Sequence, residues 1–164
     1  MESDSAPADL QVARALVAAQ GYAELGMLDD ALGELAALSA VARRRVDVLG
    51  LRVQLLVQNR CWQPALESCR QLCALEPHSP QPFIHAAFCL HELGQTVEAR
   101  ALLLAGPESL RREATYYYNL GCYEATLGDI AGAQNFLRTS FQMDKKFREF
   151  ARTDPDLAAV RDLL

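Results

Sequence analysis

The chain has 164 residues, about the length of one domain, and 51% of them are apolar and 23% charged. This balance is that of an ordinary globular chain, and it excludes a disordered tail protein, a collagen-like chain and a small disulfide scaffold. The net charge of -5 argues against nucleic acid as a partner, because phosphate backbones require a basic face.

The first segment in chain order, residues 1–8, is expected to be frayed. It belongs to an acidic, polar start, MESDSAPADL, that lacks the basic and apolar stretches of a secretory signal. The sequence has no run of about 18 apolar residues, so no membrane insertion is expected. Its five cysteines are odd in number and form no C-x-x-C motif, which favours reduced thiols and a cytoplasmic protein.

Residues 12–147 repeat with a period of 34 residues, which is most visible in four alanines: Ala31, Ala65, Ala99 and Ala133. Twelve residues before these alanines lie residues of small or moderate size: Ala19, Val53, Ala87 and Gly121. Five residues before the alanines lie Gly26, Arg60, Gly94 and Gly128. Four residues after them lie Leu35, Cys69, Leu103 and Leu137.

This register predicts that each unit consists of two helices joined by a tight turn. The glycine ends the first helix, where a left-handed backbone costs a residue without Cβ least. The small residues lie where the paired helices approach closely, and the apolar residues at helical spacing fill the seam between neighbouring units. The sequence therefore predicts four units without insertions, at residues 12–45, 46–79, 80–113 and 114–147.

Local signals at the unit boundaries agree with these frames. Ser79-Pro80 predicts an N-cap and a first-turn proline at the start of the third unit. Gly106-Pro107 predicts an early end to the second helix of that unit. Asp154-Pro155 predicts the start of a last helix within residues 148–164, which would cap the final apolar seam.

The repeats resemble the tetratricopeptide repeat family, in its bacterial type, whose period is also 34. The fourth unit carries the family pattern most fully, at Tyr117, Leu120, Gly121, Gly128, Ala133 and Leu137. The resemblance covers roughly four-fifths of the chain, with four units in residues 9–147. It implies an all-α fold, a right-handed α-solenoid of four helix pairs with a C-terminal capping helix.

In that family the first helices of successive units line a concave groove that binds peptides. The resemblance places eight residues of this chain in the groove: Gln20, Gln54, Val57, Ile84, Phe88, His91, Tyr118 and Cys122. None of them is a lysine, so the carboxylate clamp that some members use does not fit. An apolar stripe with amide, imidazole and phenol groups suits an extended or helical segment with apolar anchors.

Several residue pairs have a chemical interpretation beside the structural one. His85 and Cys89 lie four residues apart on a predicted helix, and His91 and Cys122 are able to approach from neighbouring helices, as metal ligands would. Cys69 and Cys73 are spaced as a redox pair could be. Packing is the favoured interpretation of all these residues. No catalytic motif is present, so neither catalytic residues nor a metal or cofactor is expected.

One basic run, residues 43–45, falls at the junction between the first two units. It is expected to be solvated, although it would also suit the edge of a surface for an acidic partner.

These observations predict a non-catalytic protein-interaction module, a scaffold that binds a peptide segment of a partner in its groove. One alternative is a chaperone of a secreted client, because residues 82–99 resemble the third repeat of type III secretion translocator chaperones. A second alternative is self-association, in which the groove or the opposite face binds another copy and forms a homo-oligomer.

Overall fold

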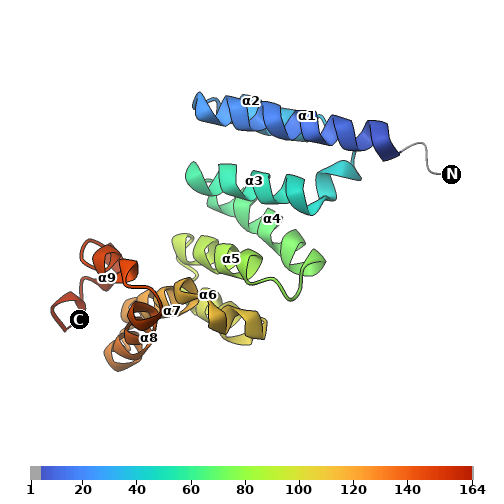
Figure 1. The fold of residues 1–164 in the computed structure, drawn as a ribbon. Helices are drawn as coiled ribbons and strands as arrows, with labels where there is room; N and C mark the ends of the chain where they lie inside the picture. Colours follow the sequence, from blue (N-terminus) through green and yellow to red (C-terminus); the bar gives the residue numbers. More distant parts are fainter. Residues whose placement is uncertain (1–4, 164) are drawn as a thin grey trace. The chain divides into compact units, whose positions relative to one another are not determined.

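The computed structural model describes residues 5–163, with the side chains of residues 8–162, and this part of the chain is all-helical, without a strand (Figure 1). Its nine α-helices pack mainly as sequence neighbours. The chain divides into two compact units, Met1–Leu75 (unit 1) and Glu76–Leu164 (unit 2). None of the described helices has the length and apolar character that crossing a membrane requires.

Unit 1 consists of two helix pairs, drawn from blue to green in Figure 1. The first pair is α1 (Ser5–Glu24) with α2 (Leu28–Ala36), and the second is α3 (Val46–Gln58) with α4 (Trp62–Leu75). Both α1 and α2 also contact α3. The buried side chains between these three helices form one apolar cluster, which includes Val12, Ala19, Leu35, Val48 and Leu55. The first pair therefore buries its apolar side partly against the second.

Unit 2 also contains two helix pairs, followed by a C-terminal segment. The pairs are α5 (Pro80–Glu92) with α6 (Thr96–Ala105), and α7 (Ala114–Leu127) with α8 (Ile130–Met143). The first helix of the first pair, α5, contacts the first helix of the second, α7. We call residues 144–163 the C-terminal segment. It contains α9 (Lys146–Phe150), which packs on α8, and the 3-10 turns η3 (Pro155–Leu157) and η4 (Arg161–Leu163), of which η3 packs on α7.

In each of the four helix pairs, the same left-handed turn joins the first helix to the second. The backbone φ angle is +74° at Gly26, +57° at Arg60, +78° at Gly94 and +89° at Gly128. In each turn the following amide donates to the carbonyl five residues before it, at 2.9 Å, 2.8 Å, 2.9 Å and 2.9 Å respectively. This is the hydrogen bond of a Schellman-type helix end, which favours glycine because glycine has no Cβ. The helix pairs predicted from the 34-residue period are therefore present, and Arg60 adopts the conformation of the glycine it replaces.

The repeated small residues lie where the paired helices meet. The four repeated alanines are all 0% exposed. Gly121 shows why a small residue is needed on the facing helix: a Cβ added there would lie 2.6 Å from Cγ of Leu137. In unit 2 Pro80 is the first residue of α5, as predicted, and α6 ends at Ala105, before Gly106-Pro107. Ser79 occupies the N-cap position, but its side chain makes no capping hydrogen bond.

The two ends of the chain differ from the sequence expectation. Residues 5–8, expected to be frayed, belong to α1, and residues 1–4 lie outside the described part. The prediction of a single capping helix within residues 148–164 is wrong, because α9 ends at Phe150 and the described residues after it contain 3-10 turns and no further α-helix. Asp154 does cap the first of them, accepting the backbone N–H of Asp156. The backbone N–H of Val160 donates to the carbonyl of Leu157 at 3.0 Å, a bond of 3-10 type, and both side chains are 0% exposed.

Candidate functional site

The groove residues predicted in unit 1 lie on the first helices, α1 and α3. Gln20 on α1 and Gln54 on α3 are exposed, and Val57 is half-buried one turn after Gln54. Their amide groups are therefore available to solvent, with a partly covered apolar side chain beside them. We call this surface the α1/α3 face.

The groove residues predicted in unit 2 lie on α5 and α7 and are much less accessible. Ile84, Tyr118 and Cys122 are buried, at 5%, 8% and 4% exposure, while Phe88 and His91 are half-buried. The turn η3 packs on α7, so the C-terminal segment covers part of the surface that the sequence assigned to a partner. We call this surface the α5/α7 face.

Asp154 binds two of the predicted groove residues. The Tyr118 hydroxyl donates a hydrogen bond to Oδ2 of Asp154 at 2.7 Å, and Sγ of Cys122 donates to the same oxygen at 3.7 Å. Oδ1 of Asp154 accepts the backbone N–H of Asp156 at 3.0 Å. Both carboxylate oxygens are therefore engaged, as expected for a partly buried charged group.

Asp156 binds a third predicted groove residue. Nε2 of His91 lies 3.0 Å from Oδ2 of Asp156. Because a carboxylate only accepts, the imidazole proton is on Nε2 and donates to Asp156. The other ring nitrogen, Nδ1, lies 3.0 Å from the Thr96 hydroxyl, and the ring packs against Tyr123 with 4.8 Å between centroids. These contacts fix the imidazole toward the C-terminal segment.

The donors on α7 remain protonated at neutral pH. Burial raises the pKa of the Tyr118 hydroxyl far above its ordinary value, and its hydrogen bond to Asp154 adds to the shift. Burial also raises the pKa of the Cys122 thiol, and the charges of Asp154 and Asp156 raise it further. Neutral donors facing two carboxylates therefore define the chemistry of this face.

Apolar contacts anchor the same segment. Leu157 and Val160 are both 0% exposed, and the ring of Phe147 packs on that of Tyr118 at 4.9 Å between centroids. Nη2 of Arg161 donates to the backbone carbonyl of Asp154 at 2.8 Å, which braces the segment against itself. The α5/α7 face thus combines carboxylate recognition with an adjacent apolar contact.

Within the described residues, Cys122, Asp154 and Asp156 form the group whose donor atoms are arranged as metal ligands would be. These atoms lie within 4.8 Å of one another. The hydrogen bonds from Tyr118, Cys122 and His91 already account for their positions. The sequence interpretation that His91 and Cys122 approach each other from neighbouring helices corresponds here to two donors that bind adjacent aspartates.

The other pairs considered from the sequence are not members of this group. His85 is half-buried on α5, and burial lowers its pKa, while Cys89 one turn later is 0% exposed. Cys69 is 0% exposed, and burial raises the pKa of the half-buried Cys73 thiol to about 11. A raised pKa leaves little thiolate at neutral pH, so this pair has the character of packing residues rather than of reactive thiols.

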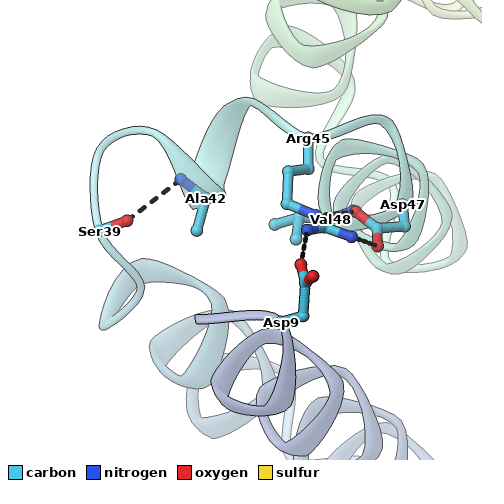
Figure 2. A network of polar contacts seen from close by, with 6 residues as sticks. All are labelled: Asp9, Ser39, Ala42, Arg45, Asp47 and Val48. Carbon is cyan, nitrogen blue, oxygen red and sulfur yellow. Dashed lines mark hydrogen bonds and ion pairs between the residues drawn. The ribbon is translucent and has the colours of Figure 1, made fainter. Parts of the chain in front are cut away.

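The basic run in unit 1 has two roles. Arg45 joins α1 to the start of α3, because its guanidinium binds Asp9 and also Asp47, with Nη2 3.0 Å from Oδ2 of Asp47 (Figure 2). The hydrogen bond from Arg45 lowers the pKa of Asp47. Arg43 and Arg44 instead line a cavity of about 330 Å³, together with Arg52.

Sequence patterns do not predict Asp154 and Asp156 as members of the site. Asp154-Pro155 predicts only the start of a helix, and Asp154 does act as a cap. Its second role depends on Tyr118, 36 residues earlier in the chain, and local patterns carry no such information. The available signal was the paired acidic sequence Asp-Pro-Asp-Leu following the last repeat.

Comparisons with known proteins add no assignment, because no protein-family model matches the chain and no curated protein matches it.

Proposed function

We propose that this chain is a tetratricopeptide repeat protein whose four helix pairs form a right-handed α-solenoid. In this proposal it acts in the cytoplasm as a non-catalytic interaction module that binds a peptide segment of a partner protein. The first helices of the pairs provide the binding surface.

The repeated turn is the observation that carries this proposal. A left-handed residue, the same hydrogen bond and a fully buried alanine recur at intervals of 34 residues in all four pairs. A helix pair of this kind buries its apolar side by stacking, and stacked pairs leave their first helices on one face. The period and the helix-pair geometry together are typical of the family that the sequence resembles.

The α1/α3 face has side chains that suit an extended peptide. Exposed Gln20 and Gln54 each offer a carbonyl acceptor and an amide donor, so either is able to bind a peptide backbone. Val57 adds apolar contact beside them. Affinity on the order of micromolar, about -8 kcal/mol, is expected for a short segment held in this way.

Selection of peptides from a random display library on the full chain tests this proposal. The double variant Gln20→Ala, Gln54→Ala should weaken binding of the selected peptides about thirtyfold, because it removes two hydrogen bonds with a net value of about 1 kcal/mol each. A matched control is Gln63→Ala, Gln71→Ala, which removes two exposed glutamines from the second helix α4. Equal affinities for both variants, measured by fluorescence anisotropy, would place binding elsewhere and reject the proposed face.

A further inference from the structure

We propose that the α5/α7 face of unit 2 recognises an acidic peptide segment with the pattern Asp-X-Asp-Leu, and that residues 154–157 are its ligand within the same chain. A partner that carries such a segment would compete with the C-terminal segment for this face. The inference rests on the peptide-binding function proposed above and names a partner class for one of its surfaces.

The donor pattern supports an acidic ligand. Three donors from two helices, the Tyr118 hydroxyl, the Cys122 thiol and Nε2 of His91, all end on carboxylate oxygens of the segment. The two oxygens that receive them belong to residues two apart, Asp154 and Asp156. Hydrogen bonds to an ionised acceptor are stronger than neutral ones, so a segment with two carboxylates at this spacing is preferred over its amide counterpart.

The apolar part of the pattern comes from Leu157. This side chain is 0% exposed and follows Asp156 directly, within the turn η3 that packs on α7. A buried leucine beside two bound carboxylates fixes the direction of the segment and its register. The combination distinguishes a specific ligand from a merely acidic one.

The way the segment is held is compatible with exchange. The side chain of Asp156 is 35% exposed, so water reaches one of the two carboxylate contacts. The backbone hydrogen bonds of residues 154–160 join residues of the C-terminal segment to one another, so side-chain contacts are what hold this part on α7. A segment linked to its own site has an effective concentration on the order of millimolar, which a free partner must overcome.

A synthetic peptide of residues 150–162, carrying a fluorophore, provides the probe. The full-length variant Asp154→Asn, Asp156→Asn weakens the internal ligand while it leaves α5 and α7 unchanged. This variant should bind the peptide at least tenfold more tightly than the unmodified chain does, by fluorescence anisotropy in EDTA-treated buffer. A peptide with asparagine at both aspartate positions should bind at least tenfold more weakly to the same variant.

Labelling of Cys122 by a thiol reagent, located by mass spectrometry, reports whether the face has opened. The Asp154→Asn, Asp156→Asn variant should label Cys122 faster than the unmodified chain, and added peptide should restore protection. Far-UV circular dichroism and thermal melting check that the helix pairs remain folded. If Cys122 stays protected and the variant takes up no peptide, the segment is a permanent cap and the proposal is wrong.

A face variant identifies the binding surface. In the Asp154→Asn, Asp156→Asn background, Tyr118→Phe removes one donor and should weaken peptide binding several-fold. Tyr117→Phe, on the same helix but half-buried, is the matched control and should leave binding unchanged. Equal losses in both would overturn the assignment of the face, as would peptide binding that requires added zinc, because the aspartates would then be metal ligands.

The two proposals fail separately in these experiments. If library peptides bind at the α1/α3 face and the peptide of residues 150–162 does not bind, only the acidic-segment inference is rejected. If neither class of peptide binds, the interaction function is rejected together with it.

Discussion

Units 1 and 2 have the same construction and different accessibility. Each has two helix pairs, the same left-handed turns and fully buried alanines at the helix crossings. In unit 1 two of the three predicted groove residues end in exposed amides, whereas in unit 2 three of the five bind the aspartates of the C-terminal segment. Equivalent positions in a repeat therefore share their backbone role but not their chemical one, which in unit 2 is set by the C-terminal segment.

The two units also differ in residue type at equivalent positions of the 34-residue repeat. The seam residue after the repeated alanine is a cysteine in one pair of unit 1 and a leucine in both pairs of unit 2, and all three are buried. One turn in unit 1 has arginine where both turns of unit 2 have glycine. Substitutions at matched positions test how far the two units are energetically alike.

The largest expected effect is at the seam position. Leu137 in unit 2 is 0% exposed, so Leu137→Ala should lower the free energy of unfolding by about 2–5 kcal/mol through lost apolar contact and a cavity. The matched change in unit 1, Cys69→Ala, removes one atom and should cost about 1 kcal/mol. Urea denaturation followed by circular dichroism measures both, and equal losses would contradict the comparison.

The helix crossings should respond alike in the two units. Ala65 on α4 is 0% exposed, and Ala65→Leu should cost about 1–3 kcal/mol because the added atoms have no space. Ala133→Leu in unit 2 should fall in the same range. Ala74→Leu, at an exposed position near the end of α4, is the control and should change stability by less than about 0.5 kcal/mol. Fluorescence of Trp62, the single tryptophan, follows unit 1 directly. An unchanged transition in Ala65→Leu would show that the crossing is loosely packed.

A smaller difference in stability is expected at the start of the second helix, between the last pair of unit 2 and the first pair of unit 1. Asp129 in unit 2 accepts the backbone N–H of Gly132 at 2.9 Å, so Asp129→Ala should cost about 1 kcal/mol. Met27 occupies the matched position in unit 1, where no side chain caps α2. Met27→Asp should stabilise unit 1 by about 0.5–1 kcal/mol. Thermal melting measures the change in stability of both variants. A loss of stability in Met27→Asp would show that the turn in unit 1 cannot accommodate a cap.

The smallest expected effect is at the left-handed turn. Arg60 has a φ of +57°, a conformation that costs a residue with Cβ about 1 kcal/mol or more. Glycine removes this strain but gains entropy in the unfolded chain, so Arg60→Gly should stabilise unit 1 by about 0.5 kcal/mol. Gly128→Ala in unit 2 should destabilise by about 1 kcal/mol. Trp62 fluorescence during urea unfolding measures the first change, and a destabilised Arg60→Gly would mean that the arginine side chain contributes more than its backbone costs.

The features predicted correctly from the sequence depend on local spacing. The turns and the buried alanines follow from residues within one unit, and the regular period makes each unit support the interpretation of the others. The left-handed turn also forms where glycine is absent, because the same hydrogen bond is made at Arg60.

The features that the sequence did not predict depend on distant contacts. His91 and Asp156 are 65 residues apart, and their hydrogen bond follows from how η3 packs on α7 rather than from any period. The expectation of a capping helix relied on Asp154-Pro155 as a start signal, and it did not account for the burial of Leu157 and Val160 in 3-10 geometry. The peptide-binding role of the predicted groove residues stays a prediction.

The burial of Leu157 and Val160 has a consequence for shortened forms of this protein. A nonsense codon upstream of Asp154 would uncover apolar surface on α7 and leave the thiol of Cys122 open to oxidants. Such a product would retain its helix pairs and expose apolar surface, which is the feature that chaperones and proteases detect in the cell. Loss of residues 154–164 would therefore lower the abundance of the protein before it altered any of its repeats.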